Sequence, residues 1–431
     1  MQASQRLAAL AVARVLAGAT LPAALAATGA DAPGPARALV HELAYGTLRH
    51  WGTLAFLVRA LADKRIPDAR LRALVAVALY QLGHAHQPPF AVVDQAVHAA
   101  ASVARPAARG LVNAMLRRYL RERDALHAKA RADPVARWSH PRWWIDRVLA
   151  DWPDQGATIL EAGNTRPPQS LRCNARATSR DALLARFAAA GVAARAEGAA
   201  GLVVEPPRPV TELPGYDEGA FSVQDLGAQL AAPLLRAGDG MRVLDACAAP
   251  GGKLTHVLEL ASVEALALDS DATRLDRVRE NLARLRLASP AVRVAQGDAA
   301  RPRDWWDGAP FDRVLADVPC TASGIVRRHP DGKWIRREAD VAAFAARQRA
   351  ILEALWPVVK PGGELLYVTC SVFRAENDAV VDAFAASRAD ALREPITFAE
   401  GAAHSGGQLL PSREAGGHNQ DGFFFARLRK P

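Results

Sequence analysis

Two cysteines in this chain stand where a thiol could do chemistry. Cys320 closes the segment Asp317-Val-Pro-Cys320, and Cys370 lies within Thr369-Cys-Ser371, each after a short apolar run. Carbon 5 of cytosine is a poor nucleophile, but a thiolate that adds to carbon 6 turns the ring into an enamine able to attack a methyl donor. The intermediate must then lose a proton and expel the thiolate, which needs a second functional group, while Asp317 could hold the base edge. Two thiols and an acid therefore predict methyl transfer to a pyrimidine.

A glycine-containing turn in the same half of the chain predicts where the methyl donor binds. It runs from Asp245 to Lys253 with the sequence Asp-Ala-Cys-Ala-Ala-Pro-Gly-Gly-Lys, and its small residues let a ligand approach the backbone. It is neither a dinucleotide fingerprint nor a Walker loop. Asp269, after the next apolar run, could bind ribose hydroxyls, and Asp298, after the third, could bind an adenine amino group. These features predict an adenosine-containing ligand without a pyrophosphate, for which S-adenosylmethionine is the obvious candidate.

Short apolar runs alternate with helical patterns throughout this half of the chain, with helices expected at 273–287 and 341–359. Such alternation predicts a parallel, doubly wound α/β sheet with ligands at the carboxyl ends of its strands. The fourth and fifth strands should lie beside each other and beside the first, which would bring Cys320 and Cys370 together. The predicted strands are 241–246, 265–268, 292–295, 311–316 and 364–368.

The first 130 residues instead show an almost wholly helical pattern, with apolar residues at three- and four-residue steps. Pro88-Pro89 should end one helix and begin the next. The alanine-rich stretch Leu7–Ala30 resembles a secretory signal, but Arg14 interrupts it, so the expectation is a first amphipathic helix. Arginines recur on this bundle and indicate either a solvated helix face or an RNA-binding surface: Arg109, Arg117, Arg118, Arg121 and Arg123.

Between these halves, residues 134–229 are rich in tryptophan, proline and arginine and predict a small α+β domain. A linker should follow through Pro206, Pro207 and Pro209. Four tryptophans here could stack on bases, although core or interface positions are the commoner use of this residue: Trp138, Trp143, Trp144 and Trp152.

Composition agrees with a folded, multidomain protein that binds a polyanion. The 431 residues are 50% hydrophobic and 23% charged, and 54 Lys plus Arg against 45 Asp plus Glu give a net charge of +9. The four cysteines show no zinc-ligand spacing, which argues against a metal or disulfide framework and for a reducing cytoplasm. No apolar run is long enough for a membrane span.

Eleven segments together resemble the Sun/Fmu family of RNA cytosine-C5 methyltransferases, and within it the bacterial branch that acts on small-subunit ribosomal RNA. The catalytic half supplies the most specific matches, and the helical half supplies weaker ones along the whole chain. The segments are Asp245–Lys253, Asp317–Cys320, Arg327–Asp331, Lys333-Trp334, Thr369–Ser371, Glu376-Asn377, Glu42–Arg49, Gly110–Arg118, Asn164–Pro168, Ser222–Asp225 and Asp421–Arg427.

The resemblance implies a role for each matching residue. Cys370 would attack the base and Cys320 would assist product release, with Asp317 in the catalytic site. It also implies a NusB-like all-helical RNA-binding domain at 1–130, a small α+β RNA-binding subdomain at 131–230 and a Rossmann-like class I methyltransferase domain at 231–431. Two positions depart from the family pattern, Val318 and Cys173. The implied cofactor contacts are Cys247, Ala248, Ala249, Pro250, Gly251, Gly252, Lys253, Asp269, Asp298 and Asp317, with Cys247 itself structural.

The implied partner is 16S ribosomal RNA, free or in early assembly, bound by a monomer without a metal or membrane. Three alternatives stay open at this point. The same reaction could act on transfer RNA, or the chain could be a ribosome-assembly factor with a vestigial methyltransferase fold. A DNA methyltransferase would use Cys320 as the nucleophile and leave Cys370 without a role.

Overall fold

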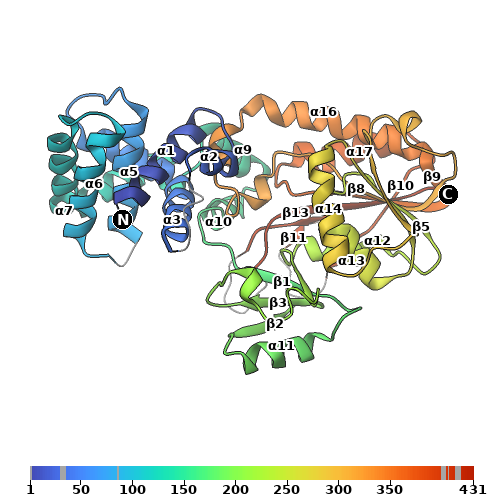
Figure 1. Ribbon diagram of the computed structural model, residues 1–431. Coiled ribbons are helices and arrows are strands. Elements are labelled where there is room, and N and C mark those ends of the chain that lie inside the picture. The colour runs from blue at the N-terminus through green and yellow to red at the C-terminus, as the bar shows by residue number, and fades with distance from the viewer. Residues whose placement is uncertain (1, 30–34, 85–86, 399–403, 406, 413–418) are drawn as a thin grey trace. The chain divides into compact units, whose positions relative to one another are not determined.

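The structure is a computed structural model that describes residues 2–29, 35–84, 87–398, 404–405, 407–412 and 419–431 (Figure 1). Its backbone divides into two compact units. Unit 1 comprises Met1–Arg166 and Val326–Glu338, and unit 2 comprises Pro167–Ile325 and Ala339–Pro431. The segment 326–338 therefore belongs to unit 1, although the chain before and after it belongs to unit 2.

Unit 1 is built from helices. The single helix expected over Leu7–Ala30 is wrong, because the chain forms two helices there. Gly18 adopts a left-handed backbone conformation with φ of +108°, and Pro22 lies in the first turn of the second helix, where its missing N–H is tolerated. The helices are α1 Gln2–Leu16, α2 Leu21–Ala27, α3 Pro35–Arg49, α4 Trp51–Leu61, α5 Ala69–His84, α6 Pro89–Val103, α7 Ala108–Ala132, α8 Pro134–Trp138, α9 Arg142–Asp151 and α10 Gly156–Ala162.

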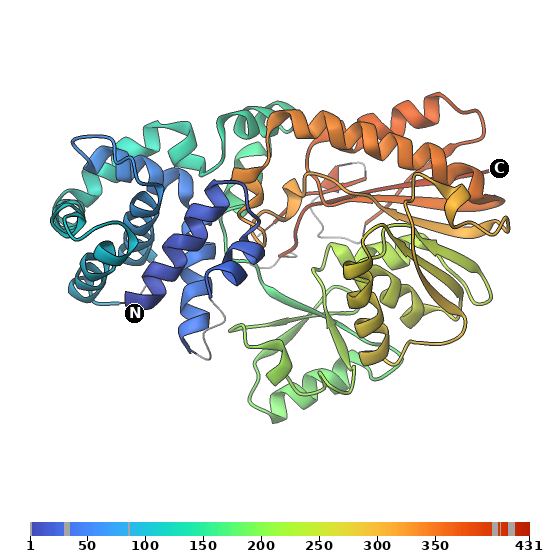
Figure 2. The ribbon, with the colours of Figure 1, turned by 45° about the horizontal axis from the view of Figure 1, so that its top comes forward.

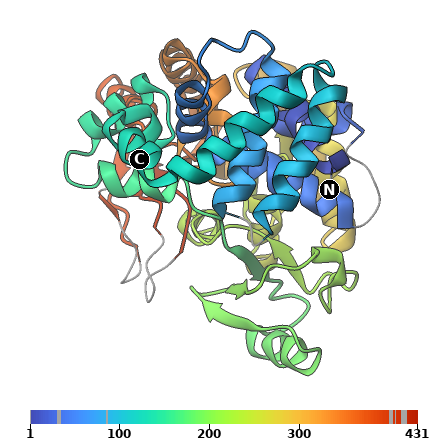
Figure 3. The same cartoon turned by 90° about the vertical axis from the view of Figure 1, so that its left-hand side faces the viewer.

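The core of unit 1 forms around α1, which packs against α3, α5 and α6 through small buried residues such as Ala8 and Ala11. Figure 3 shows α6 and α7 side by side. Helix α6 begins at Pro89, as the proline pair predicted. Trp144 and Trp152 are only 1% and 2% exposed, so these two tryptophans are core residues and not a stacking surface.

Residues 326–338 belong to unit 1, and buried polar contacts hold them there. They contain α15, Gly332–Ile335. The Lys333 ammonium donates to the Arg49 carbonyl at 2.9 Å and to Asn164 Oδ1 at 2.7 Å, and Trp334 Nε1 donates to the Leu48 carbonyl. Burial lowers the pKa of Lys333 well below its usual value. This part of the family-like sequence is therefore used for packing within unit 1.

Unit 2 contains the predicted doubly wound sheet, with strand order β11-β12-β13-β9-β8-β5-β6-β7 and β10 paired with β13. The pairs between β9 and β7 are parallel, and β13 is antiparallel to β9. One predicted neighbour is wrong: β8 borders the first strand, β5, but β9 borders only β8 and β13. The strands are β5 Arg242–Asp245, β6 Glu264–Asp269, β7 Val292–Gln296, β8 Phe311–Asp317, β9 Val359–Thr369, β10 Leu392–Glu394, β11 His404–Ser405, β12 Gln408–Leu409 and β13 Phe423–Arg429.

Helices cover both faces of this sheet, as Figures 1 and 2 show. Successive strand residues point to opposite faces. Val243 therefore packs with α12 to α14, whereas Leu244 packs with α16 and α17. The bounds of these helices are α12 Ala231–Leu235, α13 Gly252–Leu260, α14 Ala272–Arg284, α16 Glu338–Leu355 and α17 Asp378–Ala386.

A second, antiparallel sheet lies in the same unit, with strand order β2-β3-β1-β4 and helix α11, Arg180–Ala189, against it (Figure 2). Its strands are β1 Gln169–Cys173, β2 Ala194–Glu197, β3 Gly201–Val204 and β4 Phe221–Val223. Cys173 is a buried residue of this core, and burial raises the pKa of its thiol to about 11. Its departure from the family pattern thus introduces an unreactive, hydrophobic thiol.

A buried ion pair joins the small sheet to α13. The Arg172 guanidinium on β1 donates to both carboxylate oxygens of Glu259 on α13, at 2.8 and 2.6 Å, and both side chains are almost fully buried. Arg172 also donates to the Gly252 carbonyl at 2.7 Å, at the first residue of α13. The small sheet is therefore tied to the helix that begins at the glycine-containing turn.

Candidate active site

The two predicted reactive thiols meet at the carboxyl ends of neighbouring strands. Strand β8 ends at Asp317, three residues before Cys320, and β9 ends at Thr369, directly before Cys370. Asp317 pairs with Val368 in the parallel ladder, so both chain segments leave the sheet at the same edge. The Sγ atoms of Cys320 and Cys370 are 3.4 Å apart. The tertiary structure thus brings together two thiols that are 50 residues apart in sequence.

The two thiols differ in environment. Cys320 is 8% exposed, whereas Cys370 is half-buried and more accessible to a ligand. The hydrogen bond with Cys370 and burial raise the pKa of Cys320 well above its usual value, and the charge of Glu376 adds to this effect. Cys320 is therefore a neutral thiol at pH 7 that can donate its proton toward the Cys370 sulfur.

The turn between β5 and α13 has the shape that a ligand-binding backbone needs. Gly251, directly before α13, has φ of +96°, which favours glycine, and a side chain there would crowd Val278 at 3.3 Å. The Asp269 carboxylate accepts the Ala249 N–H at 3.1 Å and the Asp271 N–H at 3.1 Å. Asp269 thus holds the turn in place as well as standing at the end of β6.

Lys253 and Asp317 form an ion pair beside the thiols, with 2.5 Å between Nζ and Oδ2. Burial alone would lower the pKa of Lys253, but the Asp317 charge raises it above its usual value. The side chain of Asp317 is 29% exposed, so a ligand can reach the carboxylate. The pair couples the predicted cofactor turn to the strand that leads to Cys320.

Asp245 supplies a buried carboxylate whose oxygens have no well-formed hydrogen bond from any described residue. It is 2% exposed, and burial, followed by the nearby Asp317 charge, raises its pKa to about 7. A buried carboxylate without donors is costly unless a cation or donor satisfies it. The site therefore fits a ligand that carries an amino group, as S-adenosylmethionine does, and sequence patterns alone had assigned Asp245 no contact.

The remaining predicted cofactor residues lie around the same strand ends. Asp298 follows β7; its carboxylate is 41% exposed and accepts the Ala300 N–H at 3.0 Å. Burial and three surrounding carboxylates raise the pKa of the Cys247 thiol. Cys247 therefore stays protonated, in keeping with a structural thiol. Val318 is 3% exposed and packs with the residues under α16, so its departure from the family pattern is a core substitution.

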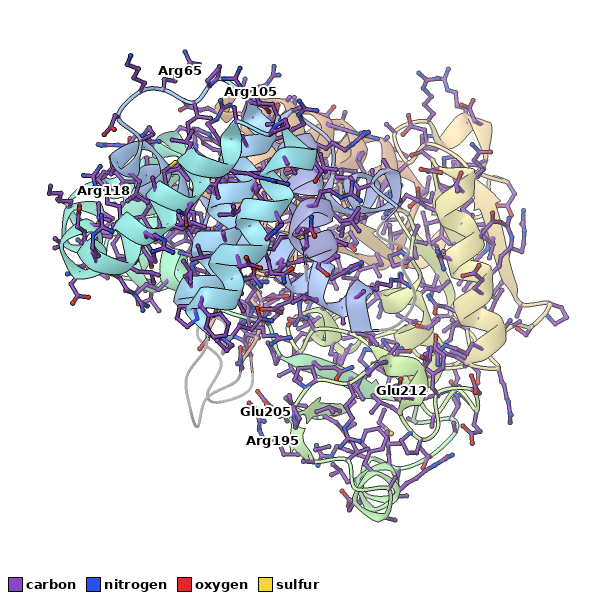
Figure 4. The ribbon with its side chains drawn as sticks, turned by 60° about the vertical axis from the view of Figure 1, so that its left-hand side comes forward. Arg65, Arg105, Arg118, Arg195, Glu205 and Glu212 are labelled. Atoms are coloured by element: carbon purple, nitrogen blue, oxygen red, sulfur yellow. The ribbon has the colours of Figure 1, made fainter. Side chains whose placement is uncertain are left out.

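The arginines of α7 do not form one continuous face. Arg117 and Arg121 are exposed and lie four residues apart, on the same side of the helix. Arg118 instead pairs with Glu122 at 3.1 Å and with Asp63 at 3.8 Å. Figure 4 labels Arg118 at the surface of unit 1, together with Arg65 and Arg105 on nearby loops. Arg109 and Arg123 are exposed as well, so four of the five predicted arginines are exposed and Arg118 is the one paired with acidic side chains among them.

The described residues contain no group of three or more His, Cys, Asp or Glu side chains that could hold a metal ion. Within the same ranges, no helix is long and apolar enough to cross a membrane.

Comparison with known proteins gives matches along the whole chain. Family models match at residues 232–429 (16S rRNA methyltransferase RsmB/F), 140–211 (RsmF/B-like ferredoxin-like domain) and 2–121 (NusB family). The ribosomal RNA small subunit methyltransferase B of Pseudomonas putida is 44% identical, covering 91% of this chain and 90% of that protein. The crystal structure of PH0851 has a TM-score of 0.81 at 24% identity, covering 100% and 99% of the two chains. A methyltransferase homologue from Pyrococcus horikoshii has a TM-score of 0.59 at 26% identity, covering 69% and 97%.

Proposed function

Because the chain belongs to the 16S rRNA methyltransferase RsmB/F family, we propose that it methylates carbon 5 of a cytosine in 16S ribosomal RNA through a covalent bond to Cys370. The observation that carries the proposal is the 3.4 Å contact between Cys320 and Cys370 at neighbouring strand ends. A buried cysteine that only fills space needs no second thiol beside it, whereas addition to a base and its later release need two reacting groups.

In the proposed mechanism Cys370, the more accessible thiol, adds to carbon 6 of the base. Cys320 donates its proton toward the Cys370 sulfur beforehand and so favours the thiolate. Asp317 accepts hydrogen bonds from the base edge, and the ion pair with Lys253 holds that carboxylate in place. These groups activate carbon 5 for methyl transfer.

Cys320 then serves product release. Its raised pKa depends first on Cys370, through their hydrogen bond and the Cys370 charge. Once the Cys370 sulfur is bonded to carbon, that charge is gone and the pKa of Cys320 falls, so Cys320 can release its own proton to solvent and then act as a thiolate base. It gains this ability at the step in which carbon 5 must lose its proton and the Cys370 sulfur must leave.

We propose that S-adenosylmethionine is the methyl donor, which supplies an electrophilic methyl group on a sulfonium. The backbone of residues 247–253 would hold it, with Asp269 on the ribose hydroxyls, Asp298 on the adenine amino group and Asp245 on the ammonium group. The unpaired carboxylate of Asp245 supports this placement, because an ammonium group would satisfy it.

Asp269→Ala is expected to weaken S-adenosylmethionine binding more than tenfold. It removes hydrogen bonds from ribose hydroxyls to a carboxylate, each worth about 1.5 to 3 kcal/mol, and it also frees the Ala249 N–H. Isothermal titration calorimetry would measure the change in Kd. Asp271→Ala is a matched control, since Asp271 caps α14 without contacting the turn; a smaller loss for Asp269→Ala than for Asp271→Ala would contradict the assignment.

We further propose that unit 1 contributes to RNA binding, and we retain the predicted functional parts 1–130, 131–230 and 231–431. Arg117→Glu with Arg121→Glu should weaken binding of ribosomal RNA and flatten its salt dependence, because each phosphate contact contributes about 0.7 to 0.9 to the slope of log K against log salt. Fluorescence anisotropy at several salt concentrations would show this. Arg118→Gln is the control, because its acidic partners already neutralise Arg118. An unchanged slope in the double variant would remove the docking role.

The substrate is tested most directly in cells. Methylation at carbon 5 protects a cytosine from conversion by bisulfite. In a deletion strain, bisulfite sequencing of 16S ribosomal RNA should therefore show one additional converted cytosine. The wild-type chain should restore that methylation, and Cys370→Ala should not. Loss of methylation in transfer RNA instead, with 16S ribosomal RNA unchanged, would favour the alternative substrate.

A further inference from the structure

Two consecutive buried residues, Glu376 and Asn377, bind the residues next to the two thiols. Both are 0% exposed and stand between β9 and α17. Their sequence matches the family pattern, but nothing in that pattern indicates what they do. Their hydrogen bonds assign them to different thiols.

Glu376 binds Thr321, the residue that directly follows Cys320. Thr321 donates its backbone N–H to Glu376 Oε1 at 2.8 Å and its hydroxyl to Oε2 at 2.5 Å. Gln348 on α16 completes the arrangement, because its Nε2 donates both to the Pro319 carbonyl at 2.9 Å and to Glu376 Oε1 at 3.2 Å. The residues before and after Cys320 are therefore tied to one buried network.

Asn377 holds Cys370 in the same way. Its Oδ1 accepts the hydroxyl of Thr369 at 2.6 Å, and its Nδ2 donates to the Ser371 carbonyl at 2.9 Å. These are the residues directly before and after Cys370. The two networks are joined by the Ser371 hydroxyl, which donates to Glu376 Oε2 at 2.7 Å and lies 3.4 Å from the Thr321 hydroxyl.

The donor pattern around Glu376 suits an ionised carboxylate, which can only accept. Burial raises its pKa, but the donors from Thr321, Ser371 and Gln348 oppose that effect. Each oxygen accepts two of these hydrogen bonds, and neither thiol is among the donors, so Glu376 is not placed to exchange a proton directly with Cys320 or Cys370. Its contribution must come from where it places the groups that it binds.

We propose that Glu376 and Asn377 are positioning residues with separate tasks, Glu376 placing Cys320 for product release and Asn377 placing Cys370 for attack on the base. The inference rests on the proposed two-thiol reaction. Its physical basis is that a misplacement of a reacting group by about 1 Å can cost about a hundredfold in rate. Because each residue holds a different thiol, its loss should slow a different step.

Glu376→Gln, which keeps the shape but replaces an acceptor by a donor, is expected to behave like a weak form of Cys320→Ala. Single-turnover methyl transfer to a 16S ribosomal RNA transcript should stay within about threefold of wild type, while steady-state turnover falls about 10- to 100-fold. A protein–RNA adduct that contains the methylated base should accumulate on a denaturing gel. Asn377→Asp, which removes the donor to Ser371, should slow single-turnover transfer by a similar factor, and no adduct should accumulate.

Melting temperature and S-adenosylmethionine affinity serve as folding controls. If Glu376→Gln does not fold, Thr321→Val and Gln348→Met each remove only part of the same network and should each give a smaller accumulation of adduct. Equal slowing of both steps in all variants, without adduct, would overturn the separate tasks. Adduct in Cys320→Ala but in none of the Glu376, Thr321 and Gln348 variants would also overturn them, whereas no adduct in Cys320→Ala would instead refute the two-thiol reaction itself.

Discussion

Cys370→Ala is expected to abolish methyl transfer and to leave no covalent RNA adduct, because carbon 5 of the base is then never activated. The loss should be on the order of 10⁴-fold or more, as is usual when the nucleophile itself is removed. Cys320→Ala should have a different effect: addition and methylation proceed, but release fails. A denaturing gel of enzyme, 16S ribosomal RNA and S-adenosylmethionine should therefore show a slowly migrating band for Cys320→Ala alone.

The double variant without either thiol should lose that band, which identifies Cys370 as the attached residue. Cys173→Ala is the matched control, since it removes a buried thiol from the core of the small sheet, away from the strand ends that carry Cys320 and Cys370. A trapped adduct in Cys370→Ala would make Cys320 the nucleophile, as in the DNA methyltransferase alternative. Intact methylation with no adduct in any variant would remove covalent catalysis from the proposal.

Arg172→Met should destabilise unit 2 by about 3 to 5 kcal/mol, because it leaves the Glu259 carboxylate buried without its cation. For a unit of this size the loss corresponds to a fall of roughly 6 to 20 °C in Tm. Burial already raises the pKa of Glu259, so removing Arg172 should raise it further and favour the protonated carboxyl. Scanning calorimetry of the full chain would measure the shift.

The charge itself is the expected cause, and a second substitution tests this. Arg172→Met combined with Glu259→Gln should recover much of the lost stability, since no uncompensated charge then remains. Arg176→Met is a control four residues further along the chain, because exposed Arg176 donates to the Leu258 carbonyl near the end of α13 and to the Ser262 hydroxyl. A double variant as unstable as the single one would show that Arg172 acts through packing and not through its ion pair.

Sequence patterns alone predicted the doubly wound sheet, the glycine-containing turn and the contact between Cys320 and Cys370. These features depend on local information: the alternation of apolar strands and helical segments, the conformation that Gly251 permits, and the rule that parallel strands end at one edge. The predicted contacts of β8 with β5 and with β9 are confirmed, whereas the expected contact of β9 with β5 is wrong, because β8 lies between them. The break between α1 and α2 was missed because Gly18 and Pro22 interrupt an otherwise continuous apolar pattern.

The pairing of buried polar groups, in contrast, could be seen only in the tertiary structure. Glu376 meets Thr321 across 55 residues, and Arg172 meets Glu259 across 87 residues. Lys333 lies in the segment Val326–Glu338, which belongs to unit 1 although the rest of that unit is Met1–Arg166. Periodicity predicts that a residue is buried, but a buried polar side chain is tolerated only with a specific partner, and that partner is set by the packing of distant elements. For this reason the contact between Cys320 and Cys370 could be predicted from sequence, whereas the hydrogen-bond partners of the residues beside them could not.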